Sequence, residues 1–510
     1  MKLIKLSKIA MAVAAMTAAP AAFALTPAQI DDSTAKLWLS GASAPTASVY
    51  KGALTLCQGV SYKDAAGVTH TNPGAIDAHL YLEKPDAGKL PGGSGDRNAY
   101  ACTVQTDDGR AGSLEGQKVV VFHTVEGGSF NAYAPHISIG GEVNPDLPTN
   151  LQRIANIEGL AAAGKCAAGA AESVNVDISG LLNPVGVYRN CDRTTQTWTA
   201  GQALRANVYA TPDRPEGGLS DTEYVINKLN LNISTDLSII GGEVGTNIGQ
   251  AFGVATSYPM YYLLQQQDIA ASKIAATCDD APFTATAPNL TAACQPDLAS
   301  GKYAQFVNVD NIGPLLDGSA LGAPAGTKVN IARRTPTSGT QSSSNMRFLN
   351  KPCAAGPAGG FLNPARAVNS TAKVVFSESS STGGVKTALT TATTAGELGM
   401  GVVSLENVPS GSGTDGKWAF VKLDGASGNS DAKQRANAIA GTYTFSYELV
   451  GFTAATAFTE GQDLVASVVS SLGNPGITDL TGLFITKDAG ASGSNVSNLG
   501  RSGNSCQIAF

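Results

Sequence analysis

Short runs of β-branched and aromatic residues alternate along this chain with segments in which apolar residues recur at helical spacing. The strand-like runs lie at 36–40, 118–124, 251–255, 328–332, 372–377, 400–405 and 418–423. Helical patterns follow several of them, over about 46–57, through 260–264 and up to about residue 349. Such alternation predicts an α/β protein with parallel strands and crossover helices.

The stretch from about residue 130 to residue 215 breaks this pattern. It is rich in Ala and Gly, holds two cysteines and has no clear apolar period. These features predict an insertion or a loop-rich subdomain within the α/β framework. The length of 510 residues favours two or more domains.

The first residues have the form of a Sec-type signal peptide. Lys2, Lys5 and Lys8 precede an apolar stretch over 9–19, and Ala22-Phe23-Ala24 supplies a small-x-small cleavage site. We therefore expect residues 1–24 to be a signal peptide, with Leu25 as the first mature residue. No later segment has the ~18 apolar residues of a membrane span. A Gram-negative-type periplasmic location, or secretion to the cell surface, is the resulting expectation.

Eight cysteines follow the signal peptide, and an even number in an exported protein favours disulfides over metal ligation. No CxxC pair occurs, so no metal site is expected. Pairing between nearest neighbours is the simplest arrangement, although eight cysteines allow 105 connectivities. That arrangement is 57–102, 166–191, 278–294 and 353–506.

Charge and motif content disfavour several functions. With 34 basic and 40 acidic residues the net charge is −6, which is unlike the basic surfaces of nucleic-acid binders. All four histidines lie between residues 70 and 136, and neither a GxSxG elbow nor a phosphate-binding P-loop occurs. The GxGxxG string at 411–416 precedes a strand pattern, where a dinucleotide site needs a helix. We expect no enzyme activity and no cofactor.

The segment 334–340, RTPTSGT, stands between a strand pattern and a helical pattern. A helix amino terminus presents unpaired N–H groups and the positive end of the helix dipole, which together attract anions. Ser338 and Thr340 add hydroxyl donors, Gly339 permits close backbone approach, and Arg334 offers a two-pronged donor. Taken alone, the segment could equally be an ordinary strand–turn–helix with a serine cap.

Three further turns share this composition: 41–46 (GASAPT), 127–129 (GGS) and 218–221 (GLSD). Each is individually more typical of a capped turn than of a site. Four such turns in one chain, one with an arginine and one with an aspartate, favour a shared anion site.

In order and type these turns resemble the ligand loops of the periplasmic phosphate-binding proteins of ABC-type transporters, which have a type 2 periplasmic-binding-protein fold. That family has loops of the form GAGATFPAPVY, a Gly/Ser turn, GASD and RxDGSGT; here they read GASAPTASVY, EGGSF, GLSD and RTPTSGT. The resemblance extends from about residue 36 to residue 473, with long unmatched insertions. It implies two lobes joined by a hinge: lobe one from 25–236 and 411–510, with the insertion at about 130–215, and lobe two from 237–410.

The resemblance also implies roles for single residues. Arg334, Ser338, Gly339 and Thr340 would hold the anion, and Asp221 would accept a hydrogen bond from a protonated oxygen, which sulfate lacks. Ser129 and Thr46 would donate from lobe one.

The sequence departs from the family's pattern at the site itself. Pro336 replaces the acidic residue two after the arginine, the first loop is one residue shorter, and Glu126 adds a negative charge.

Capture of a small oxyanion, most plausibly inorganic phosphate delivered to an ABC transporter permease, is therefore the expected function. The competing hypothesis is a cell-envelope or surface-layer protein that reuses this fold for self-assembly. The long insertion, the low charge and the altered loops favour it.

Overall fold

The computed structural model describes residues 25, 29–83, 97–106, 109–155, 157, 166, 172–178, 181–279, 287–307, 316–353, 373–428, 435–478, 482–489, 496–498, 500–501 and 504–507. The expected signal peptide lies outside these residues. Every strand-like run named above overlaps a strand, and 118–124 coincides with one. The expected helices are present and begin or end within a few residues of their predicted limits.

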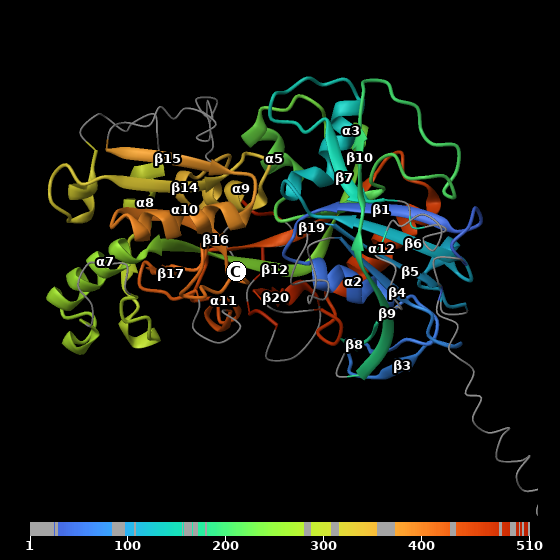
Figure 1. Cartoon of the computed structure of the whole chain (residues 1–510), viewed down its shortest axis with the longest axis horizontal. Helices are drawn as coiled ribbons and strands as arrows, with labels where there is room; N and C mark the ends of the chain where they lie inside the picture. The colour runs from blue at the N-terminus through green and yellow to red at the C-terminus, as the bar shows by residue number, and fades with distance from the viewer. Residues whose placement is uncertain are drawn as a thin grey trace, which may run out of the picture.

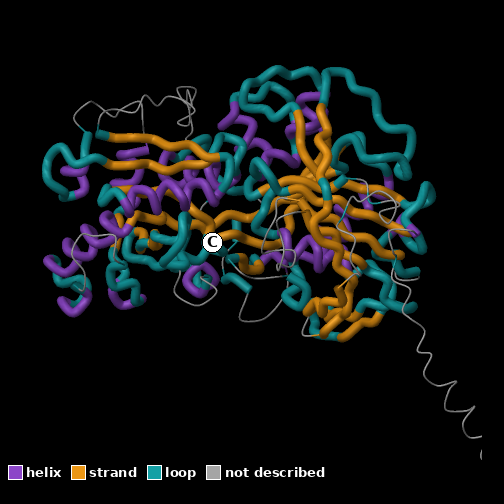
Figure 2. The backbone as a smooth tube through the Cα atoms, in the orientation of Figure 1, coloured by secondary structure: helices purple, strands orange, loops and turns teal. Residues whose placement is uncertain are grey.

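Within the described residues, fourteen strands form one mixed sheet that runs the length of the molecule (Figures 1 and 2). Twelve of them lie in the order β15 (Val374–Ser379), β14 (Val329–Arg334), β16 (Leu398–Ser404), β12 (Gly241–Ser257), β19 (Ser446–Ala454), β11 (Gly217–Ser220), β1 (Ala35–Gly41), β6 (Lys118–Thr124), β5 (Arg97–Thr103), β4 (His79–Glu83), β9 (Leu181–Cys191) and β8 (Glu172–Ile178). β17 (Trp418–Phe420) and β20 (Leu483–Ile485) pair with β12.

Helices cover this sheet and connect its strands. They are α2 (Thr46–Leu54), α3 (Ala134–Ile139), α5 (Tyr224–Leu231), α6 (Leu237–Ile240), α7 (Tyr258–Ala270), α8 (Ser300–Val307), α9 (Gly339–Leu349), α10 (Thr382–Thr394), α11 (Ala436–Ile439) and α12 (Thr459–Leu472). Three two-stranded sheets complete the fold: β2 (Ser61–Lys63) with β3 (Thr69–Thr71), β7 (Asn150–Ile154) with β10 (Arg193–Thr197), and β13 (Asp297–Leu298) with β18 (Lys422–Leu423).

The sheet carries two separate hydrophobic cores, which define two lobes. In lobe one, Leu37 of β1 and Val121 of β6 pack with Leu464 of α12. In lobe two, Ile331 of β14 packs with Val385 of α10 and other side chains. β12 and β19 contribute residues to both cores, so these two long strands join the lobes. The expected two-lobed α/β architecture is confirmed by the structure itself.

The boundary expected at residue 411 is wrong. Trp418 and Phe420 are buried in the core of lobe two, because β17 pairs antiparallel with β12 at Ala255–Ser257. Phe445 belongs to that core as well, and the chain returns to lobe one only near Leu449. A local pattern could not reveal this, since the assignment depends on a strand pairing across more than a hundred residues.

The expectation of parallel strands holds at the centre of each lobe and for the β4–β9 and β13–β18 pairs, but not for the rest of the sheet. β1 lies parallel to both β6 and β11, and β14 lies parallel to both β15 and β16. β5, β12 and β19 add antiparallel pairs around these two trios. The stretch 130–215 is less loop-rich than expected, because it supplies β8 and β9, which extend the main sheet, and the β7–β10 pair.

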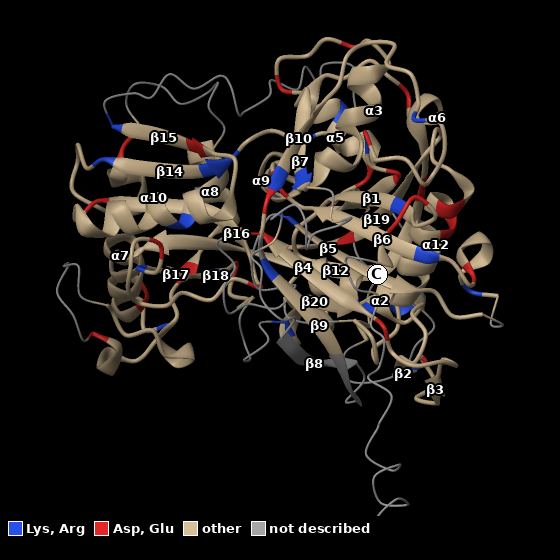
Figure 3. Cartoon of the chain, turned by 45° about the vertical axis from the view of Figure 1, so that its right-hand side comes forward, with Lys and Arg blue, Asp and Glu red and all other residues tan. Residues whose placement is uncertain are grey.

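The four expected disulfides are all present. They join Cys57 to Cys102, Cys166 to Cys191, Cys278 to Cys294, and Cys353 to Cys506. In the described part of the chain, no helix is both long and apolar enough to span a membrane. Lysines and arginines are interspersed with acidic residues over both lobes (Figure 3).

Candidate functional site

The two parallel trios direct six loops toward the junction of the lobes. The carboxyl ends of parallel strands share one edge of a sheet, where α/β proteins bind their ligands. In lobe one these ends lead into Ala42–Pro45, Val125–Gly128 and Asp221; in lobe two they lead into Thr335–Ser338, Ser380–Ser381 and Leu405–Asn407. The sequence thus places its polar turns on both sides of one junction.

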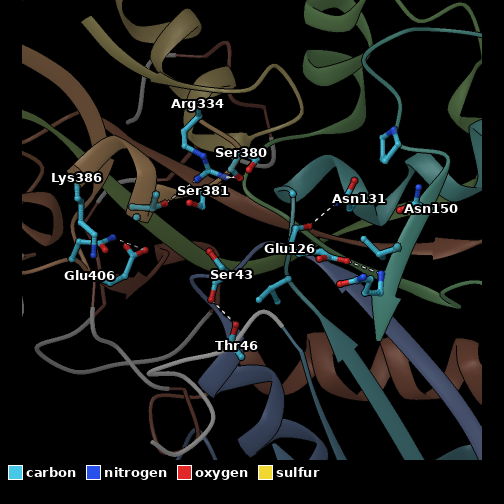
Figure 4. A pocket seen from close by; sticks show the side chains of 18 residues that line it. Ser43, Thr46, Glu126, Asn131, Asn150, Arg334, Ser380, Ser381, Lys386 and Glu406 are labelled. Atoms are coloured by element: carbon cyan, nitrogen blue, oxygen red, sulfur yellow. Dashed lines mark hydrogen bonds between the residues drawn. The ribbon is translucent and has the colours of Figure 1, made fainter. Parts of the chain in front are cut away.

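A cavity of about 670 Å³ lies at this junction (Figure 4). Lobe one lines it with Ser43, Thr46, Val125, Glu126, Gly127, Asn131, Pro148, Asn150, Leu151 and Gln152. On the other side it is lined by Arg334, Ser380, Ser381, Thr382, Gly383, Lys386, Glu406 and Asn407. The wall is therefore mainly polar, with two cations on the lobe-two side.

Arg334 is the last residue of β14 and its side chain reaches the amino end of α10. One guanidinium nitrogen, Nη1, donates to Thr382 Oγ1 at 2.9 Å, and Nη2 donates to the Ser380 carbonyl at 2.8 Å. Ser381 caps the helix by accepting the Gly384 N–H at 3.1 Å. The guanidinium charge and the positive end of the helix dipole are thereby brought together at the cavity wall.

Ser129 and Asp221 meet although 92 positions separate them, and the Ser129 hydroxyl donates to Asp221 Oδ2 at 2.7 Å. Gly339, the first residue of α9, lies directly against this pair. A Cβ atom on Gly339 would stand 2.5 Å from Asp221 Cβ and 2.6 Å from Ser129 Oγ. The residue must therefore be glycine for three predicted site residues to converge.

The predicted site residues divide into two groups. Arg334 and Thr46 line the cavity, although the Thr46 hydroxyl donates to the Ser43 carbonyl at 2.6 Å. Ser129, Asp221, Ser338, Gly339 and Thr340 are buried and are not among the residues that line the cavity. Of these, Ser129, Asp221 and Gly339 pack against one another, and Ser338 lies against Gly128.

The buried carboxyl group of Asp221 has a perturbed pKa. Burial, with a smaller contribution from the negative charge of Glu406, raises the pKa of Asp221 to about 6. The Ser129 hydrogen bond and the positive charge of Arg334 act in the opposite direction. Burial also raises the pKa of Glu406, whose carboxylate accepts from the Ser404 hydroxyl at 2.6 Å. Asp221 can therefore change protonation state in mildly acidic solution.

Glu126, which would repel an anion if its charge were unopposed, is paired with a cation of its own lobe. Arg97 forms an ion pair with Glu126 and a second one with Glu83 at 3.0 Å. The Gln152 N–H donates to the other oxygen of Glu126 at 2.6 Å. The Glu126 carboxylate therefore interacts with Arg97, while the residue still forms part of the cavity wall.

The lobes touch directly beside the cavity. The Phe130 N–H donates to the Thr337 carbonyl at 3.1 Å, and Thr337 Oγ1 donates to the Gly127 carbonyl at 3.0 Å. A polar seam between α5 and α9 continues this contact. It consists of the Ser342–Asn227 hydrogen bond at 2.9 Å and the Asn345–Asn230 hydrogen bond at 3.1 Å.

Sequence analysis missed the turn from Ser380 to Gly383, together with Lys386, Asn131 and Glu406. The turn could have been found, because it follows a strand-like run and precedes a helical pattern exactly as the RTPTSGT segment does. The other three residues offered no such signal, since their place on the wall follows from the tertiary fold. Among the described residues, no group of three or more His, Cys, Asp or Glu side chains could hold a metal ion.

Comparison with known proteins gives limited results. No protein-family model matches this sequence, and no curated protein sequence matches it either. Among solved structures, one match is a protein from Clostridium perfringens assigned as a phosphate ABC transporter substrate-binding protein, with bound phosphate. The two share 12% sequence identity with a TM-score of 0.28, and the match covers 50% of this chain and 80% of that one. Another is an ABC-type phosphate transport receptor from Vibrio cholerae: 10% identity, TM-score 0.25, covering 48% and 77%. Similarity at this level carries no functional argument, which must come from the site.

Proposed function

We propose that this protein is an extracytoplasmic solute-binding protein that captures a small oxyanion at the junction of its lobes, with phosphate as the first candidate. Capture would be reversible and would involve no chemical reaction. The expected signal peptide and the four disulfides support a location outside the cytoplasm, in the periplasm or at the cell surface. Delivery to an ABC transporter permease is the partner interaction that follows from the family resemblance.

The observation that carries this proposal is the placement of Arg334 over the amino end of α10 within the cavity. The Arg334 guanidinium is held by Thr382 and the Ser380 carbonyl, so its position is fixed before a ligand arrives. A preorganised cation beside a helix amino terminus stabilises an anion more than a mobile lysine would, because less side-chain entropy is lost on binding.

Asp221 supports phosphate over sulfate. A carboxylate can accept a hydrogen bond from the protonated oxygen of hydrogen phosphate, whereas sulfate has no proton to give. Asp221 Oδ1 is buried and has no hydrogen-bond partner among the described residues, so it retains capacity to accept. Reaching it would require the lobes to separate slightly, since Ser129 and Gly339 enclose it.

Titration calorimetry of protein refolded from denaturant in phosphate-free buffer tests this proposal. We expect one phosphate per chain and loss of binding in Arg334→Ala. Arg333→Ala is the matched control, because Arg333 lies next in the strand, pairs with Glu378 and is not on the cavity wall. Equal loss in both variants, or binding unaffected in both, would contradict the assignment of the anion to Arg334.

The envelope-assembly hypothesis remains the second candidate, and one observation favours it. The contacts of Thr337 with Gly127 and Phe130, together with the α5–α9 seam, hold the lobes in a fixed relation, which suits a building block. Size measurement in solution separates the two functions. A monomer at micromolar concentration supports capture, whereas filaments or sheets support assembly.

A further inference from the structure

The cavity is large for an inorganic anion. At ~30 Å³ per water molecule, 670 Å³ would hold roughly twenty waters, whereas a phosphate ion has five heavy atoms. Cavities of ~300–1,000 Å³ are typical of sites for whole organic molecules. The size therefore leaves most of the space to something other than a single oxyanion.

The two walls of the cavity differ in chemistry, as Figure 4 shows. Arg334, Lys386 and the hydroxyls of Ser381 and Thr382 lie on the lobe-two side and suit an anionic group. The Lys386 ammonium is opposed by the half-exposed Asp415 at 3.4 Å and by the Glu406 carboxylate on the same wall. Arg334 and the amino end of α10 therefore carry most of the attraction for an anion.

The lobe-one wall instead presents neutral amides. Asn131, Asn150 and Gln152 lie there, beside the Arg97-paired Glu126. Side-chain amides both donate and accept, and that combination matches hydroxyl groups. Among the described residues of this wall the apolar members are Val125, Pro148 and Leu151, and none is aromatic, so the wall does not favour a flat apolar ligand.

Asn131 provides an independent indication of a ligand on that wall. The residue is only 3% exposed, and its Nδ2 donates to the Glu126 carbonyl at 2.6 Å. Its Oδ1, however, has no hydrogen-bond partner among the described residues. A buried carbonyl oxygen without a partner costs ~1–3 kcal/mol. Since this atom exposes almost no surface, a donor on a bound molecule would remove that cost once the Asn131 side chain turns toward the cavity.

We infer that the cavity accommodates a hydroxyl-bearing phosphate monoester, with its phosphate at Arg334 and the amino end of α10 and its hydroxyls on Asn131, Asn150 and Gln152. This inference rests on the proposed function and specifies its solute. The separation of the two walls assigns the ends of the ligand: the anion faces the cations, and the uncharged part faces the amides.

Calorimetry with four probes tests the inference: glucose 6-phosphate, inorganic phosphate, glucose and glucuronate. We expect glucose 6-phosphate to bind at least tenfold more tightly than inorganic phosphate, with weaker or no binding of glucose and glucuronate. In Asn150→Ala, an exposed position on the wall, the advantage of the ester should shrink at least threefold while inorganic phosphate binds as before.

Each other outcome has a definite meaning. Equal binding of the ester and inorganic phosphate would overturn the inference and leave oxyanion capture intact. Binding of glucose as tight as that of its phosphate, or of glucuronate as tight, would overturn the phosphate assignment. If folded protein binds none of the four, both the inference and the proposed function fail.

Discussion

Substitution of Gly339 by alanine tests the convergence of the three loops most sharply. The added methyl group would overlap Asp221 Oδ2, and it would lie 2.5 Å from Asp221 Cβ and 2.6 Å from Ser129 Oγ. These distances are far below van der Waals contact, so Asp221 or the start of α9 must move. The backbone itself imposes no penalty, because Gly339 is not among the residues with positive φ.

The expected cost can be worked from this geometry. Overpacking of a well-filled site costs ~1–3 kcal/mol. Loss of the Ser129–Asp221 hydrogen bond, which has a charged acceptor when Asp221 is ionised, adds ~1.5–3 kcal/mol if it breaks completely. Alanine in place of glycine in a helix returns ~1 kcal/mol or less at its first residue. If the hydrogen bond breaks, we therefore expect a net destabilisation of ~1.5–5 kcal/mol.

Thermal and urea unfolding of the two proteins would measure this difference. Gly301→Ala is the matched control, because Gly301 is the second residue of α8 and an added Cβ there would meet no atom within 4 Å. That variant should be as stable as the parent or slightly more stable. If Gly339→Ala behaves like Gly301→Ala, the close packing of Gly339 against Ser129 and Asp221 is refuted.

Three further predictions concern the Asp221 carboxyl group, the Arg334 side chain and the disulfides. Because burial raises the pKa of Asp221 from 3.8 to about 6, the folded state binds this proton more tightly than the unfolded state does. The free energy of unfolding should therefore fall by ~3 kcal/mol at most as pH rises from about 4 to about 6. Melting curves at several pH values should show that Asp221→Asn loses this dependence; a difference from the parent that does not change with pH would contradict it. In calorimetry, Arg334→Ala should weaken phosphate binding by more than ~2 kcal/mol, whereas Arg333→Ala should change the affinity for phosphate little. Asp221→Asn should mainly reduce the discrimination between phosphate and sulfate. A thiol reagent should label no cysteine of the denatured, unreduced protein. Two labelled cysteines per chain would disprove the set of four disulfides.

Local signals were sufficient for much of the fold. Runs such as KVVVFHT at 118–124 are short, apolar and bounded by turn residues, so they predict buried strands with little ambiguity. The cysteines pair with their nearest neighbours, which made the simplest arrangement correct. Where pairing depends on distant segments the sequence was insufficient: the tryptophan and phenylalanine of β17 lie in lobe two because that strand adds to β12.

The candidate site shows the same division. Composition alone identified the turns that carry Arg334, Ser129 and Asp221, because Gly, Ser and Thr between a strand and a helix are conspicuous. Composition could not show that Arg97 pairs with Glu126, since the two are far apart in sequence and meet through strand pairing. Nor could it distinguish the residues that line the cavity from those that pack beside it.

Titration of phosphate into the refolded, phosphate-free protein tests the central claim most directly. The account predicts saturable binding of one phosphate per chain, little competition from sulfate, and a melting temperature that rises with phosphate concentration, since a ligand that binds only the folded state stabilises it. A correctly folded, disulfide-bonded protein that neither binds phosphate nor is stabilised by it at millimolar concentration would contradict the account.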